Sequence, residues 1–182
     1  MRWILTLAMI LVLIGTSSGC QTTLKKSEDE QMPAAERPDD FNLTLSWFTG
    51  HMADEADMYS YGITIGPLAE GLFTYRSGDQ LQQLAESFPI SDEELDHFYK
   101  KLIEMDAISN KWQMGDPIDG GPVIDISITA AGRYYAFPLF SEAAEDERKL
   151  IDEVLREAEA LVPDPLWIEM EKLRILSYGD CD

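Results

Sequence analysis

Strict alternation of apolar and polar side chains is the feature that most constrains the fold of this chain. In the stretch FNLTLSW, residues 41–47, every second residue is apolar, and the alternation returns at Tyr61–Ile65, Leu72–Tyr75 and Ile124–Ile128. A period of two sends successive side chains to opposite faces of an extended backbone. Each stretch therefore predicts a half-buried strand.

Turn residues connect these strands into hairpins. The stretch GPLAEG, residues 66–71, separates the second strand from the third, and Ala130–Gly132 turns the chain into a return strand over Arg133–Phe137. Glycine and proline supply the backbone geometry that tight turns need. Leu84–Ile90 is a further predicted strand, although the overlapping residues 81–86, LQQLAE, also fit a helical turn.

Two longer segments repeat their apolar residues with the period of a helix. The first is predicted over Ser91–Ile108, where Ser91 and Glu94 form an S-x-x-E capping box. The second is predicted over Ser141–Val162 and ends before a proline, after which a short helix begins at Asp164. Both long segments have one apolar face, so each must lie on an apolar surface.

Neighbouring strands joined by short turns predict an antiparallel sheet. The expected fold class is α+β, with a sheet built from hairpins and two main amphipathic helices packed on one face. The chain has 182 residues, so one domain is expected, over residues 41–176, followed by a frayed C-terminus at 177–182. This element order is similar to that of small hairpin-and-helix protease-inhibitor domains of the emfourin type. The similarity is one of architecture and includes no shared motif.

The N-terminal segment has the features of an export signal. Arg2 precedes an uncharged apolar run from Trp3 to Ile14, which is shorter than the roughly 20 residues that span a bilayer. Small residues follow, directly before Cys20. This arrangement resembles the lipobox of bacterial lipoproteins, although Ser17 stands where that family most often has leucine.

The lipobox resemblance implies that residues 1–19 are a signal peptide and that the Cys20 thiol of the mature chain carries lipid, with acyl chains such as palmitate. It implies a cell-envelope protein anchored to the membrane. Because Gln21 follows the cysteine in place of aspartate, it implies the outer membrane facing the periplasm if the source is Gram-negative. Residues 20–40 are polar and charged, without a sustained period, and predict a flexible tether.

The net charge limits the partners that the exported part can take. The chain has 34 acidic and 14 basic residues, a formal charge of −20. Such a surface repels nucleic-acid phosphates and anionic lipid headgroups. We therefore expect no nucleic-acid partner, and membrane contact only through the lipid on Cys20.

The sequence contains no recognisable catalytic constellation. Its two histidines, His51 and His97, lie outside any G-x-S-x-G or similar signature, so we expect a non-catalytic chain without a cofactor. The alternative is a divalent-cation-binding or hydrolytic module that uses His51 and nearby carboxylates such as Asp54. The loop that contains Asp116 and Asp119 is a second weak candidate for a metal site, because it supplies hard oxygen ligands and turns.

The candidate binding residues are aromatic residues around the polar loop at residues 49–60, between the first and second predicted strands. Trp47, Phe48, His51 and Tyr59 flank or occupy this loop, and aromatic side chains often dominate protein interfaces. The expected function is therefore that of an envelope lipoprotein whose domain binds or modulates another, unidentified envelope protein without catalysing a reaction.

Overall fold

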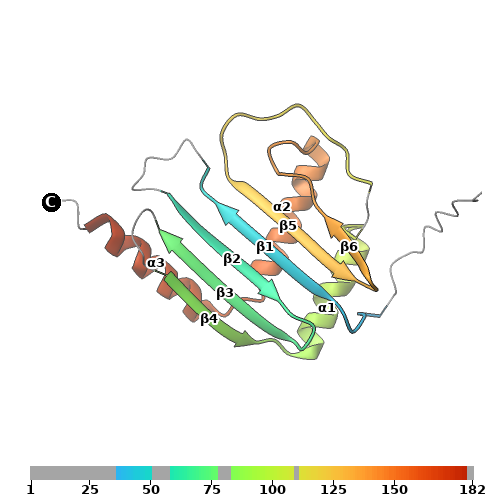
Figure 1. The fold of residues 1–182 in the computed structure, drawn as a ribbon, viewed down its shortest axis with the longest axis horizontal. Helices are drawn as coiled ribbons and strands as arrows, with labels where there is room; N and C mark the ends of the chain where they lie inside the picture. The colour runs from blue at the N-terminus through green and yellow to red at the C-terminus, as the bar shows by residue number, and fades with distance from the viewer. Residues whose placement is uncertain (1–35, 51–57, 78–82, 109–110, 180–182) are drawn as a thin grey trace, which may run out of the picture. The chain divides into compact units, whose positions relative to one another are not determined.

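An antiparallel sheet with helices on one of its faces forms the described part of the chain in the computed structural model (Figure 1). The structure describes residues 36–50, 58–77, 83–108 and 111–179. The six described strands lie in the order β4-β3-β2-β1-β5-β6. The elements are β1 (Asn42–Phe48), β2 (Tyr59–Ile65), β3 (Glu70–Ser77), β4 (Gln83–Pro89), α1 (Asp92–Glu104), β5 (Val123–Ala130), β6 (Arg133–Ala136), α2 (Glu145–Glu159) and α3 (Asp164–Gly179).

The α+β fold class predicted from the sequence is confirmed. Every described strand pair is antiparallel, and the described part of the segment that also fitted a helical turn, residues 83–86, belongs to the edge strand β4. Strand β1 lies in the middle of the sheet, where Leu45 pairs with Ile63 of β2 and with Ile126 of β5. The second hairpin thus extends the sheet that the first one begins.

The apolar side of the sheet packs against the helices. Leu43, Ile63 and Phe73 are fully buried on this side. The ring of Phe41, just before β1, meets the rings of Phe98 and Tyr99 of α1 at centroid distances of 6.3 and 5.1 Å. Burial of these rings and aliphatic side chains is the main stabilising contribution to the domain. We call this side of the sheet the helix side and the other side the open face.

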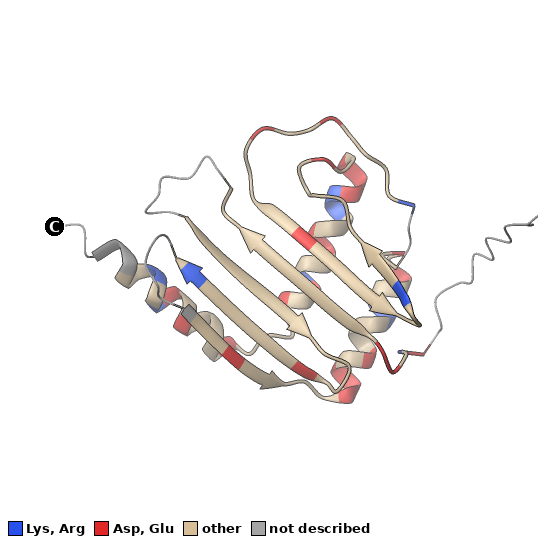
Figure 2. Ribbon diagram, viewed as in Figure 1, with Lys and Arg blue, Asp and Glu red and all other residues tan. Residues whose placement is uncertain are grey.

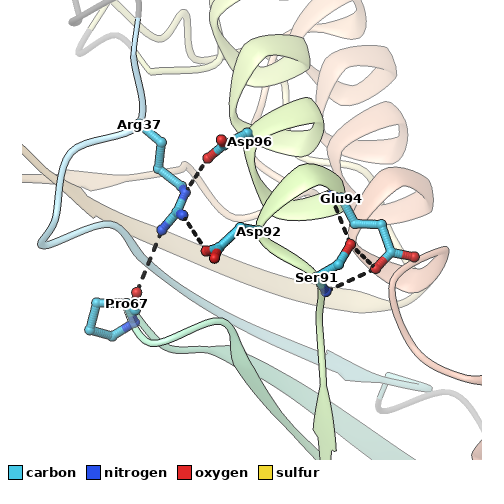
Figure 3. Close-up of polar contacts among 6 residues, drawn as sticks. All are labelled: Arg37, Pro67, Ser91, Asp92, Glu94 and Asp96. Carbon is cyan, nitrogen blue, oxygen red and sulfur yellow. Dashed lines mark hydrogen bonds and ion pairs between the residues drawn. The ribbon is translucent and has the colours of Figure 1, made fainter.

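The predicted capping box at the start of α1 is present (Figure 3). The Glu94 amide donates to the Ser91 hydroxyl at 3.2 Å, and the Ser91 amide donates to the Glu94 carboxylate at 2.9 Å. The bonds from the Ser91 side chain and backbone lower the pKa of Glu94. Two amides that a helix start leaves without a partner are therefore satisfied locally.

Helix α1 ends earlier than its apolar period indicates. The prediction extended it to Ile108, whereas it ends at Glu104 because Asp106 adopts a left-handed conformation with φ of 55°. The Asp106 amide donates to the Ile103 carbonyl, and the Ala107 amide donates to the Leu102 carbonyl. These bonds form a Schellman motif, which ends a helix while satisfying its last carbonyls.

Helix α2 begins later than predicted. Its first residue is Glu145, whereas the prediction began it at Ser141. The backbone of residues 141–144 forms hydrogen bonds with the segment before β5 and does not continue the helix. The Ala144 amide donates to the Gln113 carbonyl, and the Gly115 amide donates to the Glu142 carbonyl. A pairing between segments this far apart in the chain leaves no local periodicity that could predict it.

Helix α3 is longer than the short helix predicted after Pro163. It continues to Gly179, into the segment that was expected to be an irregular end. Leu166, Trp167, Met170 and Leu173 pack on the core from one side of it. Within the described part of the chain, no helix is long and apolar enough to cross a membrane.

Candidate functional site

The open face of the sheet is the largest surface feature that the strand register defines. Its residues alternate with the buried ones, so that Thr44 pairs with Thr64 of β2 and with Ser127 of β5. Most of its side chains are small, and many are hydroxyls. These small residues are Thr44, Ser46, Ser60, Gly62, Thr64, Thr74, Ala85, Ser87, Ser127, Thr129 and Ala136.

The larger apolar residues of the open face lie toward its borders. Phe48 and Val123 pair with each other at the end of β1. Leu72 and Val123 are more than one-third exposed, and Tyr134 of β6 is 65% exposed. The face therefore offers hydroxyl groups over its centre and exposed apolar side chains toward its corners.

Charge is unevenly distributed between the two layers (Figure 2). On the open face, the described charged residues are Glu70, Arg76 and Asp125. By contrast, the first turns of α1 and α2 consist of acidic residues. These turns are favourable places for carboxylates because the helix N-terminus carries partial positive charge. Much of the acidity is therefore placed on the helices, and the open face is left nearly neutral.

The aromatic binding residues predicted from the sequence are divided between the two sides of the sheet. Trp47 and Tyr59 lie on the helix side, where the Trp47 ring stacks on the Tyr61 ring at 5.3 Å and lies 5.0 Å from the Tyr59 ring. Phe48 alternates with Trp47 and lies on the open face. His51 is outside the described residues. Trp47 and Tyr59 thus contribute to packing against the helices, and Phe48 is the described member of the set on the open face.

A hydrogen bond joins this aromatic cluster to α2. The buried Tyr61 hydroxyl donates to the Glu159 carboxylate at the last turn of α2. Burial is the main cause of a strongly raised pKa for Tyr61, and the bond to Glu159 adds to it. The cluster continues to α3, because the Trp167 ring packs edge-on against Tyr61 and Phe73 at 5.3 and 4.8 Å.

The candidate metal ligands are only partly described. His51 and Asp54 lie outside the described residues, whereas Asp116 and Asp119 are exposed in the loop before β5. Among the described residues, no three His, Cys, Asp or Glu side chains are grouped closely enough to hold a metal ion. The site that would use His51 and Asp54 stays a prediction, as does lipid attachment at Cys20, which is also outside the described residues.

Two sets of contacts that sequence reasoning missed hold residues 37–40 on the domain, and Figure 3 shows those of Arg37. Arg37 donates to Asp96 at 2.6 Å and to Asp92 at 3.0 Å, and also to the Pro67 carbonyl in the turn between β2 and β3. Asp40 accepts bonds from backbone amides in the β5–β6 turn. The last residues of the predicted tether therefore contact the domain.

Asp40 supports a tight turn whose backbone is left-handed. Ala131 and Gly132 have φ of 52° and 70°, and their amides lie 2.7 and 2.6 Å from the Asp40 carboxylate oxygens. The bond from Gly132 is the main cause of a lowered pKa for Asp40. No sequence signal connects the residues, because the turn follows Asp40 by about ninety positions.

The outer edge of β4 is a second feature that the sequence does not reveal. Ala85, Glu86 and Ser87 are exposed in the middle of this strand. Their neighbour Phe88 pairs with Gly71 of β3, and its ring lies where a Cβ on Gly71 would stand, at 2.2 Å. Glycine at position 71 therefore lets the end of β4 lie close against β3.

Comparisons with known families and curated proteins found no relative of this chain. No protein-family model matches the chain, and no curated protein is similar to it in sequence.

Proposed function

We propose that this chain is a lipid-anchored, non-catalytic module that binds another protein of the cell envelope through the open face of its sheet. The observation that supports this proposal is the nearly neutral open face in a chain with a formal charge of −20. An acidic protein that only had to stay soluble would gain from charges on this face. Protein interfaces, in contrast, have few charged residues at their centre.

The composition of the open face favours a protein partner over other classes. Its hydroxyl groups can donate and accept hydrogen bonds, and Phe48, Leu72 and Tyr134 can be buried by a partner. Among its described residues Arg76 is the only cation, which is too little positive charge to bind a nucleic acid or an anionic lipid surface. The partner is therefore a folded protein or a peptide.

The membrane anchor is part of the same proposal. Lipid on Cys20 holds the domain near the membrane, and the tether spans about 20 Å if residues 21–36 behave as a coil. Mass spectrometry of the mature protein tests this: the wild-type chain should start at Cys20 and carry acyl mass. Cys20→Ala should leave the chain unprocessed and without lipid. A wild-type mature chain without acyl mass would refute the anchor.

A peptidase is the first class of partner to test. The order of strands, hairpins and helices predicted from the sequence is similar to that of small protease-inhibitor domains of the emfourin type. Since this similarity is limited to architecture, it suggests only where to begin. Purified chain should be assayed as an inhibitor of secreted and envelope peptidases.

Site-specific photo-crosslinking in living cells tests the open face directly. A photoreactive phenylalanine analogue is placed at Thr44 or Ser127 on the open face, and at Glu153 on α2 as the matched control. We expect one protein to be crosslinked from Thr44 and Ser127 and not from Glu153. Crosslinking from Glu153 alone, or equal crosslinking from both sides, would contradict the proposal.

A further inference from the structure

The edge of β4 carries hydrogen-bonding groups that the sheet does not use. We propose that this edge accepts an extended, basic segment of the partner protein as an additional strand beside β4. The inference rests on the proposed function. It specifies the edge of the sheet that the partner binds, and it specifies backbone hydrogen bonds and a basic side chain as the means of binding.

The hydrogen-bond pattern identifies which backbone groups of β4 point outward. The Ile90 amide donates to the Ala69 carbonyl at 2.9 Å and continues the register that pairs Glu86 with Phe73. In an antiparallel ladder, residues bond to the neighbouring strand at every second position. Glu86 and Phe88 therefore bond toward β3, whereas the amides and carbonyls of Ala85 and Ser87 point away from the sheet.

The side chains of β4 also suit an added strand. Ala85 and Ser87 lie on the open face, in register with Thr74 and Leu72. A partner strand beside β4 would therefore continue the open face, and the rest of the partner could cover its hydroxyl groups. Addition of a strand supplies affinity through backbone hydrogen bonds, and the alternating side chains supply specificity.

Helix α3 provides apolar surface on the helix side of this edge. Trp167 and Arg174 point toward β2 and β3, because Trp167 contacts Phe73 and the Arg174 guanidinium lies 5.9 Å from the Tyr59 ring centre. With 100° between successive helix residues, Leu176 lies about 180° around α3 from Trp167, on the side of the helix directed away from β2 and β3.

The α3 surface that this orientation leaves free is largely apolar, with Lys172, 63% exposed, between Ile168 and Leu176 on the helix. Leu176 is 60% exposed, and its neighbours Ile175 and Ile168 are 58% and 56% exposed. In Figure 1, α3 is visible outside β4, on the outer side of the edge.

The negative charge on the β4 edge favours a basic partner strand over a second copy of this chain. Glu86 is exposed on the helix side in the centre of β4. If β4 paired with a second copy in the register centred on this residue, two Glu86 side chains would lie directly opposite each other, which is destabilising. Two copies with a charge of −20 each would also repel one another. A partner strand with lysine or arginine opposite Glu86 avoids both the repulsion between paired glutamates and the repulsion between two acidic chains.

Hydrogen exchange of the full lipidated chain in detergent tests this inference with defined peptides. The peptide TVTKTVT places lysine opposite Glu86, valines on the helix side and threonines on the open face. The matched peptide TVTETVT places glutamate there. At about ten times the Kd, TVTKTVT should slow exchange of the Ala85 and Ser87 amides about tenfold. TVTETVT should not, and Glu86→Lys should reverse this preference.

Proline variants distinguish edge binding from a general effect on the fold. Ala85→Pro removes an outward amide without removing a bond to β3, so it should abolish the protection of the remaining Ser87 amide while thermal unfolding changes little. Ala136→Pro removes an outward amide at the opposite edge, on β6, and should leave the protection unchanged. The inference is overturned if neither peptide protects these amides, if both protect them equally, or if the two proline variants have the same effect.

The crosslinking experiment separates this inference from the proposed function. If Thr44 still crosslinks its partner in Ala85→Pro, the partner binds the open face without the β4 edge and only the inference fails. If Thr44 of the wild-type chain crosslinks no protein, the proposed function fails, whatever the peptides do.

Discussion

Replacing Trp167 with alanine tests how α3 is held on the sheet. The Trp167 indole packs edge-on against Phe73 at 4.8 Å and against Tyr61 at 5.3 Å, with interplanar angles of 64° and 82°. It is the α3 side chain with the described ring contacts to β2 and β3. Its removal should therefore weaken α3 docking and leave the pairing of the central strands in place.

The expected cost follows from burial and ring geometry. Complete burial of an aromatic side chain removes roughly 150–250 Å² from water, and the mostly buried Trp167 accounts for at least about 100 Å², worth at least about 2.5 kcal/mol. The two edge-to-face contacts add roughly 1 kcal/mol together. A loss of about 3.5 kcal/mol corresponds to a roughly three-hundredfold larger population of the undocked helix, at about 1.4 kcal/mol for each tenfold change.

Amide hydrogen exchange measures this loss for each element separately. In Trp167→Ala, the α3 amides should exchange about three-hundredfold faster, while those of β1, β2 and β5 should be little changed. Ile175→Ala is the control, since Ile175 is 58% exposed on the outer side of the same helix. Equal effects of the two variants, or unchanged α3 exchange in Trp167→Ala, would refute the assignment of Trp167 as the main docking contact.

Two more results are expected. Burial, together with the bond to Glu159, raises the pKa of Tyr61 above its ordinary value of 10.0. The unfolded chain therefore loses this proton first, and above pH 10 the free energy of unfolding should fall by up to about 1.4 kcal/mol per pH unit. Urea titrations should show a shallower fall in Tyr61→Phe, and an unchanged slope would argue against this cause. Arg37→Ala should lower the free energy of unfolding by only about 0.5–1 kcal/mol, because Asp92 and Asp96 are 83% and 49% exposed. Its cost should shrink in high salt, and a salt-independent loss would contradict an ionic contribution.

Local patterns predicted the elements but not all of their ends. The S-x-x-E motif at Ser91 located the start of α1 because its donors and acceptors lie within one turn. The end of α1 at Glu104 depended on the left-handed conformation of Asp106, and apolar periodicity does not detect such a residue. The start of α2 depended on backbone bonds to residues 113–115, which no local pattern contains.

The candidate binding surface shows the same division. Alternation placed Trp47 and Phe48 on opposite sides of β1, with Trp47 on the apolar side, but it did not show how far the helices cover that side. Packing of Trp167 against Phe73 and Tyr61 decides this, and it makes Trp47 a packing residue and Phe48 a residue of the open face. The exposed β4 edge likewise became visible only when the strand order was known.

By itself, the sequence determined the alternating strands, the amphipathic helices, the hairpin turns and hence the α+β class. These features depend on residues within a few positions of one another, and their periods can be read directly. Only the tertiary structure decided that β5 pairs with β1, that α3 lies on the same side of the sheet as the other two helices, and that Arg37 binds α1. Such contacts join residues distant in the chain, and they form because burying apolar surface offsets the entropy of closing long loops.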